Sequence, residues 1–277
     1  AARTTCIKPE GTSSCVLDTS SGIHPYHSRR GIRHVQANTM EVPFLFFQEH
    51  NGHAVSSMAG GTGHTAVIAF PYDNDPAALT KADVPALELL SAVILVRKHW
   101  VENGTRPELC VKPWLRHNVS NTVTVRDWEW DAVAEFIYEH RAHFGGVALA
   151  SASGDKVWEQ APFVAVITRE EQMTAYGDAA VRRAEDLATI VRGGLSGLWA
   201  LCRAAIAGTV NTADAYATSW VSALVSLAET SFSGDIVRAT ACVKDAWLYI
   251  YWLALNAQMV EVDWESMYEP DDNVNHA

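Results

Sequence analysis

The sequence has few cysteines, and none of them is spaced as in a metal site or a disulfide framework. The five cysteines are scattered over 277 residues, without a CxxC pair or a Cys/His cluster of zinc-finger spacing. With no secretory signal pattern either, we expect reduced thiols in a cytoplasmic protein. The longest apolar run, residues 86–96, contains Glu88 and is too short to cross a bilayer. We therefore predict no bound metal and no membrane segment.

Positive charge is also scarce. The chain carries 21 Lys and Arg residues against 32 Asp and Glu residues, which gives a formal net charge of -11. This balance argues against broad binding of nucleic acid or of an anionic membrane, and it leaves room for one local phosphate site. Hydrophobic residues make up 48% of the chain and charged residues 19%, so a substantial core is expected.

The common catalytic and cofactor motifs are missing as well. The sequence has no GxGxxG between a strand and a helix, no GxxxxGK[ST] and no HExxH. The pairs His24/His27 and His140/His143 have i, i+3 spacing, but they lack the nearby carboxylates that would complete a metal site. The order of Ser, His and Asp residues does not specify a triad. No catalytic residue and no metal ligand is predicted from these patterns.

The first 35 residues contain the stretch with the clearest chemical signature. A strand-like run at residues 4–7 is followed by the turn Lys8-Pro9-Glu10-Gly11, and Thr12-Ser13-Ser14 then begin a short helix. Backbone N–H groups at a helix start, together with hydroxyl donors, suit an anion such as phosphate. The same residue types also form ordinary helix caps, and the pattern alone does not decide between the two interpretations. Residues 20–35, rich in histidine and arginine, are predicted to be a loop with short ordered pieces. Their basic side chains fit either a solvated loop, which the pattern alone favours, or a contact with phosphates or a cofactor tail.

Hydrophobic periodicity predicts a mixed α/β chain that becomes helical in its second half. Helices are expected at residues 42–50, 84–103 and 128–144, a loop at 52–63, and strands at 65–70, 119–125 and 147–150, with further helices at 175–192, 197–207, 213–232 and 234–259. The link Gly145-Gly146 between a helix and a strand is typical of a parallel unit. Trp247, Tyr249, Tyr251 and Trp252 fit either core packing, the commoner meaning, or an aromatic box for a ligand.

Five segments in order along the chain resemble the class II, adenosylcobalamin-dependent ribonucleotide reductases. The first joins TTCIKPEGTSSCV to SSGIHPYHSRRGIRHV, and the second is RHNVSNTVTV at residues 116–125. The third is GGVAL at residues 145–149, and the fourth joins QAPF at 160–163 to ITREE at 167–171. The fifth joins GDIV, CVKD and VDWE between residues 234 and 265. Each match alone is weak, and their shared order is what favours the family.

The resemblance implies a fold and an activity. Such enzymes reduce ribonucleotides to 2′-deoxyribonucleotides by thiyl-radical chemistry, with adenosylcobalamin as the cofactor and a thioredoxin-type protein as the reductant. The chain would be the C-terminal portion of a ten-stranded α/β barrel followed by a mainly helical region. By the same resemblance, Glu10, Gly11, Thr12, Ser13 and Ser14 would bind the substrate phosphates. Gly22, Ile23 and His24 would lie on the cofactor side of the pocket.

The departures from the family are as informative as the matches. The N-x-C-x-E motif that carries the radical cysteine is missing, and so is the cysteine pair near the C-terminus. Gly31 stands where an aromatic residue is usual. We do not assign redox roles to Cys6 and Cys15, which are expected to be ordinary buried thiols.

Two functional hypotheses follow from these matches and departures. In the first, the chain is the C-terminal part of a split, interrupted or truncated reductase, inactive alone and completed by an N-terminal part. In the second, it is a non-catalytic module that binds nucleotide phosphates. The predicted regions are 1–155 for the barrel part, 156–265 for the helical region and 266–277 for a flexible tail.

Overall fold

The computed structural model describes residues 1–11, 13–17, 19–61, 63–152 and 160–267. They divide into two compact units, of which the first comprises residues 1–29 and 74–158 and the second comprises residues 30–73 and 159–277. The sequence placed residues 30–73 with the N-terminal segment, whereas the structure groups them with the later helices. The predicted boundary at residues 155/156 lies outside the described residues. Of the tail predicted at residues 266–277, the first two residues belong to a 3₁₀ turn, and the part from residue 268 onward lies outside the described residues.

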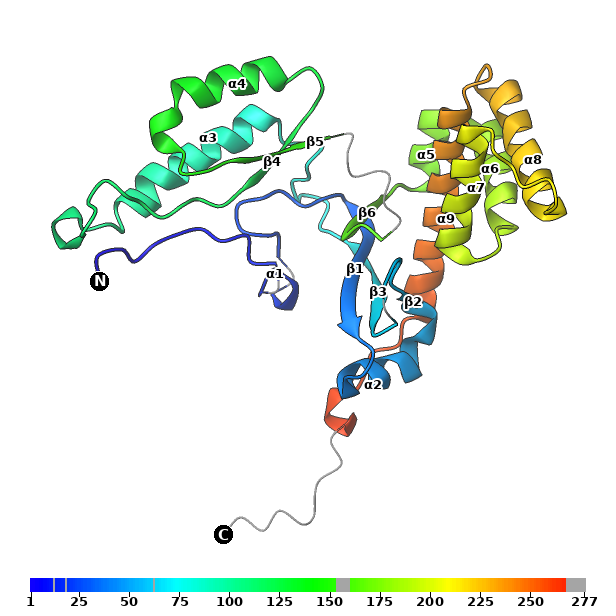
Figure 1. Ribbon diagram of the computed structural model, residues 1–277, viewed down its shortest axis with the longest axis horizontal. Coiled ribbons are helices and arrows are strands. Elements are labelled where there is room, and N and C mark those ends of the chain that lie inside the picture. The colour runs from blue at the N-terminus through cyan, green and yellow to red at the C-terminus, as the bar shows by residue number, and fades with distance from the viewer. Residues whose placement is uncertain (12, 18, 62, 153–159, 268–277) are drawn as a thin grey trace, which may run out of the picture. The chain divides into compact units, whose positions relative to one another are not determined.

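The first unit is built around two parallel strands, β4 (Thr122–Val125) and β5 (Ala148–Ser151) (Figure 1). Helices α3 (Ala86–Val96) and α4 (Trp130–Glu139) bury the alternate valines Val123 and Val125 of β4. The predicted parallel unit is thereby confirmed. Helix α3 ends earlier than expected and continues as a π-helical turn, Arg97–Glu102. The remaining short elements are α1 (Ser13–Val16) and the 3₁₀ turns Pro107–Leu109 and Arg141–His143.

The second unit contains a four-stranded antiparallel sheet in the order β2-β3-β1-β6. Its strands are β1 (Arg30–Asn38), β2 (Val55–Ser57), β3 (Thr65–Asp73) and β6 (Phe163–Val166), and helix α2 (Val42–Asn51) follows β1. The prediction of a loop over residues 20–35 is therefore wrong from Arg30 onward. The strand predicted at residues 65–70 extends through Pro71 to Asp73. Because β2 pairs only with Ala66–Ile68, Pro71 lies where β3 has a partner on one side only, and its missing N–H is tolerated.

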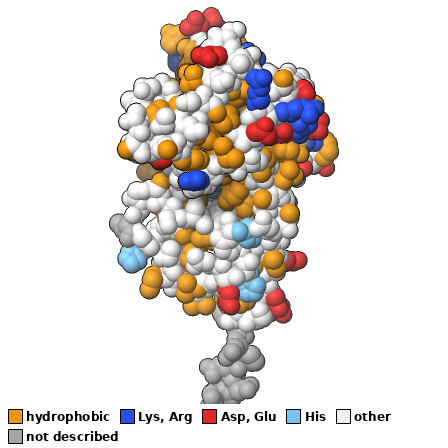
Figure 2. Space-filling view, turned by 90° about the vertical axis from the view of Figure 1, so that its right-hand side faces the viewer, with side chains coloured by type: hydrophobic (Ala, Val, Ile, Leu, Met, Phe, Trp, Pro, Cys, Tyr) orange, Lys and Arg blue, Asp and Glu red, His pale blue; other side chains and the backbone are white. Residues whose placement is uncertain are grey.

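Five helices complete the second unit: α5 (Arg169–Tyr176), α6 (Asp178–Thr189), α7 (Gly194–Ala207), α8 (Ala215–Ser231) and α9 (Ile236–Gln258), with a 3₁₀ turn at Trp264–Met267. The helix predicted at 175–192 is observed as α6, which begins only at Asp178 because Gly177, with a φ of 88°, separates it from α5, a helix that was not predicted. Asp214 and Asp235 cap α8 and α9 by accepting bonds from backbone N–H groups of the first turn. On the face in Figure 2, acidic and basic side chains lie side by side over the helices.

The structure confirms a mixed helix and sheet architecture, and the described strands do not form the ten-stranded barrel. The aromatic residues of α9, Trp247, Tyr249, Tyr251 and Trp252, pack against a buried cluster that includes Ile32 and Leu255, as the core-packing interpretation predicts. Among the described helices, none taken singly has the length and apolarity to cross a membrane. The pair α6 and α7 meets those two criteria only together, and it is bent by 119°.

Candidate functional site

The predicted phosphate loop follows a segment that lies beside residues 117–121. Ile7 forms a parallel bridge to Val119, and the N–H of Ser120 donates to the carbonyl oxygen of Ile7 at 3.1 Å. Nearby, Nδ1 of His117 is 2.9 Å from the carbonyl oxygen of Thr5. Two segments separated by more than a hundred residues, both part of the family resemblance, are therefore in direct contact. The full strand predicted at residues 4–7 is reduced to isolated bridges at Arg3 and Ile7.

The loop itself is a tight turn on the surface of the first unit. Glu10 has a φ of 54°, a left-handed conformation that side chains with a Cβ adopt at a cost, and Ser14 N–H donates to its carbonyl oxygen at 2.9 Å. Gly11 and Ser13 are exposed, and a Cβ added to Gly11 would meet nothing within 4 Å. Ser14 is buried, and its hydroxyl donates to the carbonyl oxygen of Gly11 at 3.4 Å. Thr12, which is also predicted to bind phosphate, lies outside the described residues.

The predicted phosphate-binding residues differ in how accessible they are to a phosphate. Gly11 and Ser13 are accessible to a phosphate from solvent, whereas the hydroxyl of Ser14 is already engaged within the loop. The carboxylate of Glu10 is an acceptor only, so any favourable contact with phosphate has to come from its backbone. Helix α1 has only four residues, so its dipole adds little to anion binding.

The second predicted group, Gly22, Ile23 and His24, forms a turn against the phosphate loop. The hydroxyl of Ser21 donates to the carbonyl oxygen of Pro9. Gly22 has a φ of 60°, and a Cβ there would lie 2.6 Å from the carbonyl oxygen of Lys8, so only glycine fits this approach. Ile23 packs into the buried clusters around Val123 and Val119.

His24 uses both of its ring nitrogens within the chain. Nδ1 lies 2.6 Å from the carbonyl oxygen of Ser21, and Nε2 accepts the N–H of Thr122 at 2.8 Å. A bond from His24 to cobalt would break one of these contacts. The side chains of residues 22–24 therefore do not fit as ligands to a cobalamin, and cofactor contact through them stays a prediction from resemblance.

Of the five cysteines, two are exposed, two are buried and Cys110 is partly exposed. Cys6 and Cys15 are exposed, contrary to the expectation of buried thiols, and Cys15 Sγ donates to the carbonyl oxygen of Gly11 at 2.8 Å. Cys202 and Cys242 are buried in the helical core, and burial raises the pKa of each thiol to about 12. These two thiols are therefore protonated at neutral pH. Among the described residues, no group of three or more His, Cys, Asp or Glu side chains is arranged to hold a metal ion.

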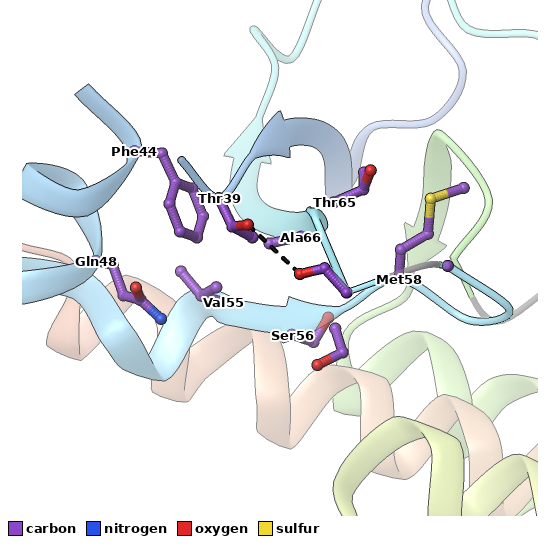
Figure 3. Close-up of a pocket in the computed structure, with 11 residues that line it drawn as sticks. Thr39, Phe44, Gln48, Val55, Ser56, Met58, Thr65 and Ala66 are labelled. Atoms are coloured by element: carbon purple, nitrogen blue, oxygen red, sulfur yellow. Dashed lines mark hydrogen bonds between the residues drawn. The ribbon is translucent and has the colours of Figure 1, made fainter. Parts of the chain in front are cut away.

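The second unit contains a separate hollow of about 310 Å³ (Figure 3). Its described lining carries no charged side chain and consists of Thr39, Phe44, Gln48, Val55, Ser56, Ser57, Met58, Gly61, Gly63, Thr65 and Ala66. The Thr39 hydroxyl donates to the carbonyl oxygen of Gly63 at 3.4 Å. This bond connects the residue after β1 to the segment that precedes β3. None of the predicted site residues lines this hollow.

Sequence reasoning missed two residues that organise these loops. Thr122 contributes its backbone N–H to His24, and no side-chain pattern signals a backbone donor. Gln160, in the QAPF segment, pairs with a loop of the second unit: its amide donates to the carbonyl oxygen of Ser57 and accepts the N–H of Ala59, both at 2.8 Å. The resemblance marked the QAPF segment without indicating this contact.

Comparison with known proteins gives one solved structure. No protein-family model and no curated protein matches the chain. The solved structure is that of a B-12 dependent (class II) ribonucleotide reductase, and the match has a TM-score of 0.44 and 19% sequence identity. It covers 60% of this chain and 21% of the solved chain, so this chain spans about a fifth of that protein's length. A match at this level does not establish a shared fold.

Proposed function

We propose that this chain is part of an adenosylcobalamin-dependent ribonucleotide reductase and that its loop at residues 10–14 binds the substrate phosphates. In this proposal an N-terminal part with the radical cysteine completes the enzyme, and a thioredoxin-type protein supplies the electrons. The chain's own contribution is to bind and orient the nucleotide, which lowers the entropic part of the barrier. No radical step is assigned to residues of this chain.

The observation that carries the proposal is the meeting of three family-like segments in the first unit. KPEG and SGIH lie within residues 8–24, and HNVSNT lies at residues 117–122, yet Ser120 contacts Ile7, next to KPEG, and Thr122 contacts His24. The turn that carries His24 also contacts Pro9 through Ser21. Segments that match a family only by chance have no reason to lie against one another. Their contact supports the interpretation of residues 10–14 as a functional loop rather than a simple helix cap.

Gly11 offers a direct test of phosphate binding. Because a Cβ at this position meets nothing within 4 Å, Gly11→Asp adds negative charge to the loop without a steric clash, and Gly11→Ala is the matched neutral control. We expect the wild-type chain and Gly11→Ala to bind tripolyphosphate, measured by titration calorimetry. Gly11→Asp is expected to bind at least about fivefold more weakly, since a like charge close by costs about 1 kcal/mol or more. Equal affinity of all three proteins would overturn the phosphate site.

Reduction itself is tested with the completed enzyme. The chain is combined with an N-terminal part that carries the N-x-C-x-E motif, and formation of deoxynucleotide is measured with adenosylcobalamin and a dithiol. We expect product only when both parts are present, and less product with Gly11→Asp than with Gly11→Ala. Binding of nucleotide without reduction in the mixture would instead favour the non-catalytic module.

A further inference from the structure

We propose that His24 is a positioning residue that, as the neutral Nδ1–H tautomer, holds the phosphate loop against β4. The inference rests on the proposed function for the role of the loop. It gives His24 a role other than ligation of the cofactor metal. This role follows from the atoms that each ring nitrogen faces and from the contacts of the turn.

The two partners of the ring fix its protonation. The backbone N–H of Thr122 can only donate, so Nε2 has to accept and carries no proton. The carbonyl oxygen of Ser21 can only accept, so Nδ1 has to donate and carries the proton. One neutral tautomer satisfies both bonds, and either the other tautomer or the doubly protonated ring loses the bond to Thr122.

These contacts form a closed cycle of hydrogen-bonded segments around residues 7–9, where the loop starts. Ile7 is tied to Ser120, and Thr122 to His24. Ser21 of the same turn then donates to the carbonyl oxygen of Pro9, two residues beyond Ile7. The approach of Gly22 to Lys8 leaves no room for the turn to move towards the loop. Residues 7–9 are thus fixed on both sides, and the loop at 10–14 begins from a rigid base.

Within this cycle of segments, the side chain of His24 links the turn to β4. Its removal leaves the N–H of Thr122 without its acceptor and frees the turn at one end. The loop then keeps its residues and its charges, but not its fixed starting point. We therefore expect weaker phosphate binding without loss of any group that touches phosphate, which is the behaviour of a positioning residue.

Nuclear magnetic resonance of the full chain tests the tautomer directly. In ¹⁵N-labelled protein, we expect the His24 Nδ1 shift to be that of a protonated nitrogen and the Nε2 shift that of an unprotonated one, with assignment by loss of the signals in His24→Gln. The amide of Thr122 is expected to exchange slowly with solvent in the wild type and rapidly in His24→Ala. The opposite tautomer, or an unchanged exchange rate of Thr122, would overturn the proposal.

Affinity for tripolyphosphate tests the consequence for the loop. We expect His24→Ala to bind about tenfold more weakly, as for a lost hydrogen bond that leaves its partner unsatisfied, and His24→Gln to recover most of the affinity because its amide oxygen replaces Nε2 as acceptor. His50→Ala is the matched control, since His50 belongs to the second unit and its Nδ1 lies 2.9 Å from the carbonyl oxygen of Phe46 on the same helix. Wild-type affinity in His24→Ala would contradict the role.

The two tests separate this inference from the function on which it rests. If the wild-type chain does not bind tripolyphosphate, the phosphate site fails, and the tautomer and the exchange rate of Thr122 still decide whether His24 holds the loop. If the wild type binds and His24→Ala binds equally well, the phosphate site stands and the positioning role fails. Circular dichroism of each variant confirms that the comparison is made between folded proteins.

Discussion

The two units of this chain are held together in different ways. In the second unit, the helices α5–α9 enclose one large apolar cluster in which Leu198, Leu224 and Val243 are fully buried. In the first unit, the buried clusters are smaller, and hydrogen bonds join the N-terminal segment to residues 100–122. The burial of apolar surface is a non-directional driving force, whereas hydrogen bonds are directional and fix the groups that they join. The contrast fits a stable helical unit and another unit in which a surface loop has to be placed accurately.

Among the substitutions that test this contrast, replacement of Trp220 is expected to lower the free energy of unfolding the most. It is 1% exposed in the helical core, and its Nε1 donates to the carbonyl oxygen of Leu187 at 3.1 Å. Replacement by alanine leaves a cavity and an unsatisfied carbonyl, so the free energy of unfolding should fall by about 3–5 kcal/mol. The measurement is urea unfolding followed by circular dichroism.

The control for Trp220 lies on the same helix. Val225 is 39% exposed, and Val225→Ala should lower the free energy of unfolding by less than about 0.5 kcal/mol. A similar loss in both variants would mean that apolar burial does not dominate the second unit. The exchange of the Thr122 amide should be unchanged by either variant if the two units unfold separately.

A smaller effect is expected at Gly31 of strand β1. Gly31 pairs with Tyr72 across the sheet, and a Cβ at Gly31 would collide with the Tyr72 ring and lie 2.6 Å from the carbonyl oxygen of Val164. The ring of Tyr72 thus covers the glycine from the neighbouring strand, as in aromatic rescue. Gly31→Ala should destabilise the second unit by about 1–3 kcal/mol, measured by urea unfolding.

A double-mutant cycle identifies the cause of that loss. If the collision with Tyr72 is responsible, Gly31→Ala combined with Tyr72→Ala should be less destabilising than the sum of the two single changes. The clash with the carbonyl oxygen of Val164 remains in the double variant, so the rescue is expected to be partial. Strict additivity would show that Tyr72 and Gly31 do not interact.

At the phosphate loop, a change should stabilise rather than weaken the first unit. Glu10 has a φ of 54°, which costs about 1–2 kcal/mol for a residue with a Cβ. Glycine avoids this cost, but it offsets part of the stabilisation because it increases the conformational entropy of the unfolded chain. Glu10→Gly should therefore raise the free energy of unfolding, measured by urea unfolding, by up to about 1 kcal/mol. Glu10→Gln keeps the Cβ and should change stability little.

The same pair of variants separates strain from charge. Both variants remove the carboxylate, so both should bind tripolyphosphate more tightly than the wild type if phosphate binds at this loop. Only Glu10→Gly should also be more stable. Equal stability of the two variants would show that the left-handed backbone at Glu10 carries no strain.

How much of this could be predicted from the sequence depended on the range of the interactions. Helices such as α8 and α9 follow from local periodicity, and the parallel pair β4 and β5 follows from the glycine link between helix and strand. Strand β1 was missed because RGIRHVQAN does not alternate cleanly, and it becomes a strand by pairing with β3 and β6.

At the candidate site, too, the sequence predicts local features but not contacts between distant residues. The residue types at 10–14 locate a loop from the sequence, because glycine and hydroxyl residues near a helix start have a local meaning. The role of His24 depends on a backbone N–H almost a hundred residues away, which no local pattern encodes. The position of Tyr72 over Gly31 is likewise a cross-strand relation that emerges only once the register of β1 and β3 is known.

The smallest effect is expected from pH, at His34 of β1. Burial lowers the pKa of His34 below its usual value of 6.5, and the bond between Nδ1 and the carbonyl oxygen of Ala161 offsets part of this shift. Below pH 6.5 the unfolded chain therefore binds more protons at this residue than the folded chain does. The stability contributed by neutral His34 is complete above pH 6.5 and is lost as the pH falls towards the lower folded pKa.

The test is urea unfolding of the second unit's helices between about pH 7.5 and about pH 5, well within the range where His titrates. We expect a shallow decrease of stability with falling pH in the wild type and a smaller decrease in His34→Gln, which cannot take up a proton. His50→Gln, an exposed histidine of the same unit, is the control and should keep the wild-type slope. The same slope in wild type and His34→Gln would show that the half-buried His34 of β1 does not link the stability of this unit to pH.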